Sequence, residues 1–333
     1  MAIEYRKKRD INQWLIILAG FLILIGSILT YIFIIRGVFG SVSVDELIPD
    51  TKSIKNAFFG PKTRAAILYS KYTDNMLPAG STWLNDNINT WKRFLGNVNI
   101  NYDIISDASV ELGKHNDYQL LILPGSKSLS DREIVEIKKY INNGGSVFAT
   151  SGTASYSNDG KWRGWEFFSE VFGSKFSKEI NSDSVSAIHT LRGGLPLTAN
   201  IPTGYPLKVA VWDRPMAVEV LDPRTIQVSF WYNYRFEEGL VREGIKNSAG
   251  ITFGNYGNGR FVWMGFELNS VIGVQEDYIY FERLFKNSIN WLTYGPIAYT
   301  KDWPSGYDAA AVIAPVLSED IYNINNNRHI NFS

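Results

Sequence analysis

One stretch near the middle of the chain limits the possible folds more than any other. It begins with a short apolar run, Leu120–Leu123, closed by a proline and a glycine, which is typical of a strand buried in a parallel sheet. Ser130 and Glu133 follow at the spacing of a capping box, in which two side chains satisfy free N–H groups at a helix start. The pattern therefore predicts a helix directly after the strand.

The end of this helix and the next strand are equally clear. Ile134, Ile137 and Ile141 recur at helical spacing and mark one buried face. Asn143-Gly144-Gly145 ends the helix, because glycine enters the left-handed conformation at little steric cost. Val147–Ala149 is the next apolar strand. A strand–helix–strand unit of this kind predicts a parallel sheet with a right-handed crossover.

Similar patterns precede this unit. Ala65–Ser70 and Tyr102–Ile105 read as strands, and Thr82 is placed to cap a helix that runs to about Leu95. Asn75–Ser81 reads as a loop at the carboxyl end of the first strand. Alternating strands and helices predict a doubly wound α/β sheet.

In the second half of the domain the spacing of apolar residues changes from the helical pattern to that of short β-strands. Three short β-rich runs are separated by turn residues: Leu207–Val211, Ala217–Leu221 and Ile226–Tyr232. Tyr256-Gly257-Asn258-Gly259 lies between two further runs, Ala249–Asn255 and Arg260–Gly265, and predicts a hairpin, since Asn-Gly readily takes positive φ angles. Trp165–Phe172 and Phe281–Leu292 read as helices. The pattern leaves open whether this half joins the sheet or forms a separate lobe.

The N-terminal region carries a candidate membrane span. Trp14–Ile35 contains no charged residue, and its 22 residues, at about 1.5 Å each, match a hydrocarbon core of about 30 Å. Four basic residues, Arg6–Arg9, precede the run, whereas Arg36 alone follows it directly. The positive-inside rule then predicts a single-pass membrane protein with a cytoplasmic N-terminus. A cleaved signal peptide is the alternative, although the apolar run exceeds the usual core of about 7–15 residues.

These signals predict five regions. They are a cytoplasmic basic tail at 1–13, a transmembrane helix at 14–36, a juxtamembrane linker at 37–62, an α/β domain at 63–295 and a tail at 296–333.

Composition narrows the function classes. Basic and acidic residues both number 33, so the zero net charge argues against a general nucleic-acid-binding protein. The absence of cysteine excludes disulfides, cysteine nucleophiles and thiolate metal sites, and we expect no cofactor. The ten tryptophans suit sugar stacking, although large aromatic side chains also fill ordinary cores.

The central stretch, LILPGSKSLSDREIVEIKKYINNGGSVFATSGTASYSNDGK, resembles the class I glutamine-amidotransferase-like fold, and in particular the β-galactosidase trimerisation domain. The resemblance rests on four short motifs: Leu123-Pro124, Leu129-Ser130, Asn143-Gly144-Gly145 and Thr150-Ser151. GNYGNGRFVWMGFELN resembles the same family's hairpin and final strand. The resemblance covers about 63–295. It implies a mostly parallel, flavodoxin- or amidotransferase-like sheet with added β-hairpins, in a protein of carbohydrate processing.

Amidotransferase chemistry needs a nucleophile activated by a histidine. Ser151 stands at the nucleophile position that the resemblance indicates, but no histidine occurs in Phe266-Glu267-Leu268, where the base is expected. His115 precedes the third strand, His189 is expected in a loop, and His329 lies outside the domain. Because a serine without a base is a poor nucleophile, we expect a non-catalytic domain.

The tail has a second resemblance. Trp303–Asp320 is similar to the opening of a polysaccharide deacetylase domain, with Glu319-Asp320 near the family's acidic pair. Pro315 interrupts the expected strand, and no H-x-x-x-H follows. A metal site needs several converging ligands, so this chain holds none complete. One hypothesis is that the chain is the N-terminal part of an anchored polysaccharide deacetylase. The alternative is that residues 296–333 are a disordered or edge-strand tail with a solvated acidic pair.

Ligands of open α/β sheets bind outside the carboxyl ends of the strands. On that basis Tyr156 and Trp162 are predicted to stack on sugar faces, and Asn158, Asp159 and Arg163 to hydrogen-bond hydroxyls. The alternative is that Trp162 and Trp165 clamp the following helix to the sheet. The sequence thus predicts a membrane-anchored module of the cell envelope that binds polysaccharide or an envelope protein. The alternative function is that of a protein-interaction scaffold, and the chain could also form a homo-oligomer.

The predicted orientation can be tested by protease accessibility. With residues 14–36 in the bilayer and the N-terminus inside, protease added to intact spheroplasts is expected to digest the domain that follows residue 63. Complete protection of that domain would contradict this topology.

Overall fold

The structure is a computed structural model that describes residues 18–27, 30, 64–180, 185–190, 194–232, 245–272 and 275–298. The chain divides into two units, Met1–Lys62 and Thr63–Ser333. In the first unit, residues 18–27 and 30 are helical. Most of the predicted span at 14–36 lies outside the described residues, and no helix within them is long and apolar enough to cross a membrane. Membrane anchoring therefore stays a prediction.

The second unit is built on one sheet whose centre is parallel. Its parallel strands lie in the order β13-β5-β3-β1-β2. Their bounds are Gly259–Met264 (β13), Ser146–Thr150 (β5), Leu120–Leu123 (β3), Arg64–Tyr69 (β1) and Asn101–Ser106 (β2). The strand–helix–strand prediction is confirmed, since β3 and β5 are parallel neighbours.

The β-rich half extends the same sheet instead of forming a separate lobe. Beyond β13 the order continues β12-β11-β8-β9-β14, with antiparallel pairing throughout, and β10 pairs with β12 and β7. The bounds are Ala249–Tyr256 (β12), Thr225–Tyr232 (β11), Val185–Thr190 (β8), Pro206–Ala210 (β9), Val271–Ile272 (β14), Met216–Val220 (β10) and Ser174–Glu179 (β7). A separate two-stranded sheet joins β4 (Ser128–Leu129) to β6 (Tyr156–Ser157).

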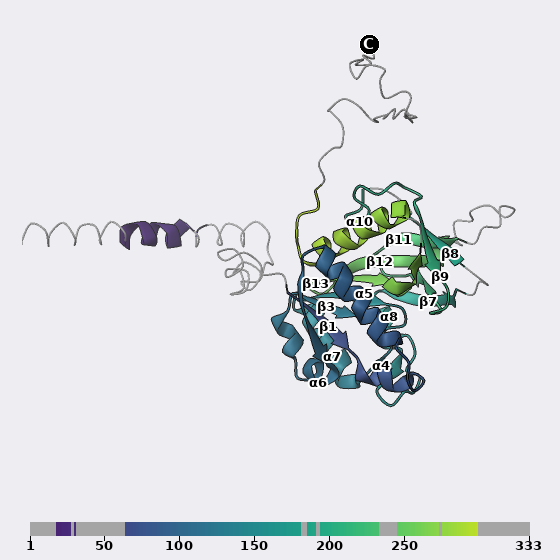
Figure 1. The fold of residues 1–333 in the computed structure, drawn as a ribbon. Helices are drawn as coiled ribbons and strands as arrows, with labels where there is room; N and C mark the ends of the chain where they lie inside the picture. The colour runs from purple at the N-terminus through teal and green to yellow at the C-terminus, as the bar shows by residue number, and fades with distance from the viewer. Residues whose placement is uncertain are drawn as a thin grey trace, which may run out of the picture. The chain divides into compact units, whose positions relative to one another are not determined.

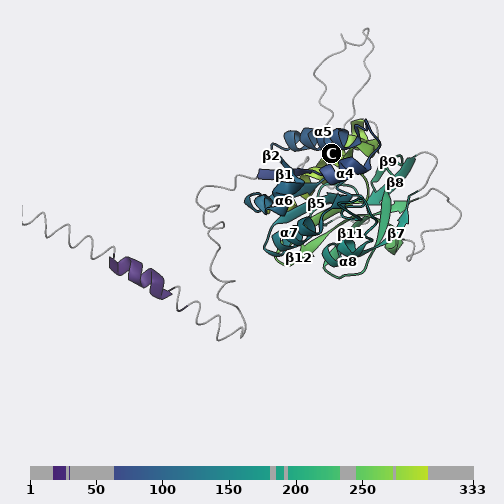
Figure 2. The same ribbon diagram turned by 90° about the horizontal axis from the view of Figure 1, so that it is seen from below.

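Helices cover both faces of the sheet (Figures 1 and 2). On one face, α5 (Trp83–Asn97) and α10 (Gln275–Leu292) share a core with the sheet. On the other face lie α6 (Asp107–Glu111), α7 (Asp131–Asn142) and α8 (Glu166–Val171). Short helices complete the connections: α4 (Lys71–Met76), η1 (Lys114–Asp117) and η2 (Leu268–Ser270).

Aromatic packing fills the α5–α10 face. Trp91 of α5 meets Phe148 of β5 edge to face at 4.8 Å between ring centroids, and Phe94 lies 5.1 Å from Phe285 of α10. All four side chains are almost fully buried. Each removes roughly 150–250 Å² from water, so this cluster joins two helices and the central strand into one core.

The predicted capping box at the start of α7 is present. The Ser130 hydroxyl accepts the Glu133 N–H at 3.2 Å, and the Glu133 carboxylate accepts the Ser130 N–H at 2.7 Å. Ser130 also donates to the Glu111 carboxylate at 2.6 Å. Burial, with Asp107 and Glu111 close by, raises the pKa of Glu133 well above its usual range.

Several local predictions were wrong. Thr82 does not cap α5 with its side chain, since its hydroxyl donates to the Asp86 carboxylate instead. The short helix α4 was not predicted; Ser70 caps it by accepting the Thr73 N–H at 3.1 Å. The predicted β12–β13 hairpin is present with its turn at Tyr256–Gly259, but Gly257 takes the positive φ that was expected for Asn258-Gly259.

The two helix starts form a matched pair for mutagenesis. Ser130→Ala removes an oxygen that caps α7 and is expected to lower the free energy of unfolding by about 1–2 kcal/mol. Thr82→Ala removes a hydroxyl with no capping bond and is expected to change it by less than about 0.5 kcal/mol. Urea unfolding followed by tryptophan fluorescence measures both, and equal losses would contradict the assigned cap.

Candidate binding site at the carboxyl ends of the strands

The carboxyl ends of the parallel strands meet along one edge of the sheet. Pro124 follows β3, Ser151 follows β5, and Gly265 follows β13. Thr150, the last residue of β5, connects these ends. Its hydroxyl accepts the Gly125 N–H at 2.8 Å and donates to a Glu267 carboxylate oxygen at 2.7 Å. One hydroxyl thus holds the segments after β3 and β13 beside β5.

Ser151 occupies the turn at which the sequence placed the degenerate nucleophile. Its φ of +47° is unusual for a residue with a side chain, and the residue is 3% exposed. Its N–H donates to the Met264 carbonyl at 2.8 Å, and its carbonyl accepts the Trp263 indole N–H at 2.9 Å. The hydroxyl oxygen itself is buried and has no hydrogen-bond partner. Two hydrogen bonds therefore hold the backbone of Ser151 in place, whereas the only titratable group in contact with its hydroxyl within the described residues is the Glu267 carboxyl.

Glu267 is the site residue that the sequence reasoning passed over. It is fully buried, and burial raises its pKa to about 7. The hydrogen bond from Thr150 and a contact with the Ser151 hydroxyl lower the pKa, but by less than burial raises it. Its second carboxylate oxygen has no partner. Its position is the available signal, because it is an acid three residues after the end of the last parallel strand, where the resemblance implies the base.

No imidazole is placed to activate Ser151 in the described part of the chain. His115 is buried in η1, where a ring nitrogen lies 3.3 Å from the Glu136 carbonyl and burial lowers its pKa. His189 lies in β8, not in the predicted loop, and β13, β12 and β11 separate that strand from β5. Four steps of about 4.8 Å put the two strands on the order of 19 Å apart. His329 lies outside the described residues.

Thr150, Ser151 and Glu267 form a buried inner region of this edge, and Trp83 packs beside it. A Cβ added to Gly125 would meet the Trp83 ring at 2.3 Å and a Glu267 oxygen at 3.3 Å, so the ring packs directly on the glycine. The Trp83 indole donates to Asp213 at 2.7 Å, and Asp213 accepts the Ser270 hydroxyl at 2.7 Å. Lys127 lies over the same ring at 5.1 Å. Trp83 therefore fills the space above Gly125.

The predicted stacking residues lie farther out along the same edge. Trp162 is 54% exposed, and its ring stands edge to face against Tyr156 at 5.1 Å and Trp165 at 5.2 Å. Trp165 in turn stacks on Phe176 of β7 at 4.6 Å. Trp165 is thus the residue that packs on the sheet, whereas Trp162 presents much of its surface to water.

The predicted polar residues surround this aromatic group. Arg163 donates to the Asp131 carboxylate at 2.6 Å and to the Tyr156 carbonyl at 3.2 Å, so it braces the loop. Asp159 pairs with Lys161 at 2.7 Å, and the Lys161 ammonium holds the Asp159 pKa well below its usual range. Asn158 is exposed. Glu319 and Asp320 lie outside the described residues, within which no cluster of three or more acids and histidines is arranged to hold a metal.

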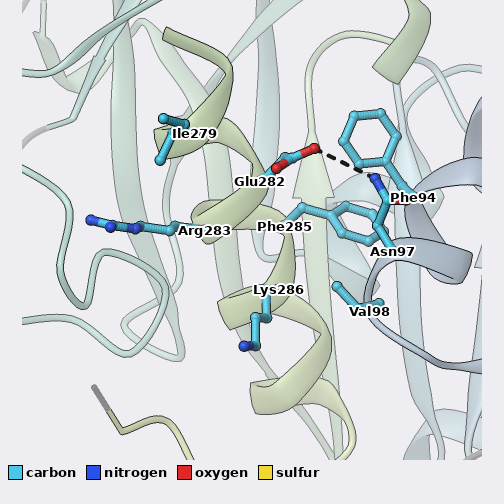
Figure 3. A pocket seen from close by; sticks show the side chains of 8 residues that line it. All are labelled: Phe94, Asn97, Val98, Ile279, Glu282, Arg283, Phe285 and Lys286. Atoms are coloured by element: carbon cyan, nitrogen blue, oxygen red, sulfur yellow. Dashed lines mark hydrogen bonds between the residues drawn. The ribbon is translucent and has the colours of Figure 1, made fainter. Parts of the chain in front are cut away.

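A groove of about 290 Å³ lies elsewhere, between α5 and α10 (Figure 3). Phe94 and Phe285 lie at its base, and Arg283 and Lys286 point outward from α10. The Asn97 side chain donates to Glu282 across it at 3.5 Å. It lies toward the C-terminal end of α5, whereas Trp83 begins that helix at the carboxyl edge, so the groove contains none of the predicted binding residues.

Solved structures show what this fold is similar to. A β-galactosidase from Bacillus circulans sp. alkalophilus is 12% identical with a TM-score of 0.51, over 71% of this chain and 32% of its own. A cold-adapted β-galactosidase from Rahnella sp. R3 is 16% identical with a TM-score of 0.50, over 73% of this chain and 33% of its own. A ThuA-like protein from Bacteroides uniformis, at 14% identity, covers 70% of this chain and 91% of its own, with a TM-score of 0.47.

These likenesses concern the fold alone. The chain spans about a third of the length of the two β-galactosidases. Their mixed α/β likeness fits the amidotransferase-like fold that the sequence resemblance implied. No protein-family model matches the chain, and no curated protein matches it.

The raised pKa of Glu267 has a measurable consequence. Between pH 4.5, the ordinary pKa of a glutamate, and pH 7 the folded protein keeps a proton on Glu267 that the unfolded chain has released. The protonated carboxyl therefore contributes its full share of the free energy of unfolding below about pH 4.5, and this share is lost as the pH rises to about 7. Glu267→Gln cannot titrate and so does not lose stability in this way. The difference in free energy of unfolding between Glu267→Gln and wild type is therefore expected to shift in favour of the variant, by on the order of 2–3 kcal/mol, from pH 5 to pH 8.

Glu282→Gln, on the exposed side of α10, is the control for a generic charge effect. Urea midpoints at several pH values measure all three proteins. The same pH dependence in wild type and Glu267→Gln would contradict the raised pKa of Glu267.

Proposed function

We propose that this chain is a membrane-anchored, non-catalytic amidotransferase-like module that binds carbohydrate of the cell envelope. The observation that carries the proposal is the exposure of Trp162 at the carboxyl edge of the sheet, with Tyr156 packed against it. An open α/β sheet presents its ligand crevice at this edge. An exposed indole face there is suited to a sugar ring, which offers a flat apolar patch of C–H groups.

The ring of Trp162 is held before any ligand arrives. Tyr156 and Trp165 contact it edge to face at about the same centroid distance, 5.1 and 5.2 Å. Arg163 fixes the loop beneath through Asp131 and the Tyr156 carbonyl. A side chain ordered in advance loses little conformational entropy on binding, so more of the stacking energy contributes to affinity.

Polar groups suited to sugar hydroxyls flank this ring. Asn158 is exposed, and the Asp159–Lys161 pair lies on the same short loop at the surface. Amide and carboxylate groups accept hydroxyl hydrogens, and ammonium groups donate to hydroxyl oxygens. The loop therefore offers both kinds of partner beside an aromatic face.

The inner region supports the non-catalytic part of the proposal. No histidine within the described residues is placed beside the Ser151 hydroxyl, and Glu267, the acid in contact with it, is held by Thr150. Trp83 fills the space above Gly125. A serine that lacks the histidine of amidotransferase chemistry is not expected to release ammonia from glutamine.

Anchoring and the wider context belong to the proposal as well. The charge-free run at 14–35 and its basic flank support a single span with the domain outside the cytoplasm. A carbohydrate-binding domain next to the bilayer would hold envelope polysaccharide near the membrane. The resemblance of Trp303–Asp320 to the start of a polysaccharide deacetylase suggests a parent enzyme for which this domain retains the substrate.

Trp162→Ala tests the proposal. We expect at least a tenfold loss of binding to envelope polysaccharide in a pull-down titration, with a free energy of unfolding within about 1 kcal/mol of wild type, because the side chain is half exposed. Tyr102→Ala truncates an exposed aromatic side chain on β2 and is expected to bind normally.

Two outcomes would contradict this assignment. Destabilisation of Trp162→Ala by about 3–5 kcal/mol is the cost of truncating a buried aromatic and would make Trp162 a core residue. Retention of an envelope protein by a wild-type chain that binds no polysaccharide would favour an interaction scaffold.

A further inference from the structure

A second tryptophan stands at the same edge of the sheet. Trp212, in the turn between β9 and β10, is 67% exposed, more than any other large hydrophobic side chain described between residues 64 and 298. Tryptophan is among the costliest side chains to leave in water.

The turn that carries Trp212 is firmly attached. The next residue, Asp213, uses both carboxylate oxygens, accepting the Trp83 indole N–H and the Ser270 hydroxyl at 2.7 Å each. The Arg214 N–H donates to the Val211 carbonyl at 3.0 Å and closes the turn. Trp212 is therefore exposed on a turn tied to the start of α5 and to η2.

These ties also place Trp212 at the carboxyl ends of the parallel strands. Trp83 is the first residue of α5, which follows the carboxyl end of β1, and Ser270 follows that of β13. The Asp213 hydrogen bonds join the β9–β10 turn to both. Trp212 thus belongs to the loops of the same edge as Trp162, although β9 itself lies far along the sheet.

A continuous chain of contacts links the two exposed tryptophans. Trp162 packs on Tyr156, whose N–H donates to the Lys127 carbonyl at 2.9 Å. The Lys127 ammonium lies 5.1 Å from the centre of the Trp83 ring, and Trp83 bonds to Asp213 beside Trp212. The series alternates aromatic rings with charged or hydrogen-bonding groups, the mixture that sugar faces and hydroxyls require.

We propose that Trp212 is a second sugar-stacking contact, and that the face from Trp162 through Lys127 and Trp83 to Trp212 binds a linear oligosaccharide of several units. The inference rests on the proposed function, because Trp162 supplies the first contact. A ligand with one or two sugars reaches Trp162 alone, whereas a longer chain reaches both tryptophans. Affinity therefore increases with ligand length, and Trp212 provides the increase.

Calorimetric titration of the full chain with two-unit and six-unit chito- and cello-oligosaccharides tests this. Wild type is expected to bind a six-unit ligand more tightly than the matching two-unit ligand. Trp212→Ala is expected to weaken six-unit binding about two- to tenfold and to leave two-unit binding unchanged, since one stacking contact is worth about 0.5–1.5 kcal/mol. Trp212→Tyr, which keeps an aromatic face, is expected to recover most of the loss.

Leu221→Ala is the matched control, because Leu221 is 57% exposed and belongs to no part of this face. Trp162→Ala is expected to weaken both ligand lengths. Urea midpoints close to wild type for all variants would show that the losses are not due to unfolding.

The outcomes separate the two claims. Wild type that binds none of the four ligands contradicts the proposed function and this inference together. Wild type that binds, with Trp212→Ala unchanged toward six-unit ligands, contradicts this inference alone. A change in oligomeric state for Trp212→Ala, with sugar binding intact, would assign Trp212 to contact with a second copy and would also overturn the inference.

Discussion

The Thr150 hydroxyl makes the hydrogen bonds on which the geometry of this edge depends. By accepting from Gly125 and donating to Glu267, it holds the segments after β3 and β13 against the end of β5. Both bonds are buried, so the loss of either partner would leave a polar group unsatisfied, at a cost of about 1–3 kcal/mol. The positions of Ser151, Lys127 and the loop that carries Tyr156 all follow from this junction.

The same junction explains why the inner region and the outer face differ in character. Glu267, whose pKa is raised, and Ser151 are both buried, and Trp83 packs on Gly125 next to Glu267. Trp162 and Trp212 stand outside this buried region on loops braced by ion pairs and hydrogen bonds. The turn at Ser151 is thus rigid, and under the proposed function recognition lies on the exposed aromatic faces around it.

Sequence patterns predicted the central fold well because it rests on local signals. The β3–α7–β5 unit, its capping box and the β12–β13 hairpin all follow from short-range periodicity and turn chemistry. The union of the β-rich half with the sheet depends on long-range pairing, which periodicity does not report. Trp83 and Glu267 were missed for the same reason: each acquires its role from a partner more than 40 residues away, at Asp213 and Thr150 respectively.

The central claim is that sugar binds the outer aromatic face and not the inner region or the α5–α10 groove. Proton–nitrogen spectra of the indole N–H groups, recorded while a six-unit oligosaccharide is added, test it most directly. The account predicts shifts for Trp162 and Trp212, a smaller one for Trp83, and none for the buried indoles of Trp91 and Trp263. Shifts at Trp91, which packs on Phe285 beneath the groove, without shifts at Trp162 would contradict it.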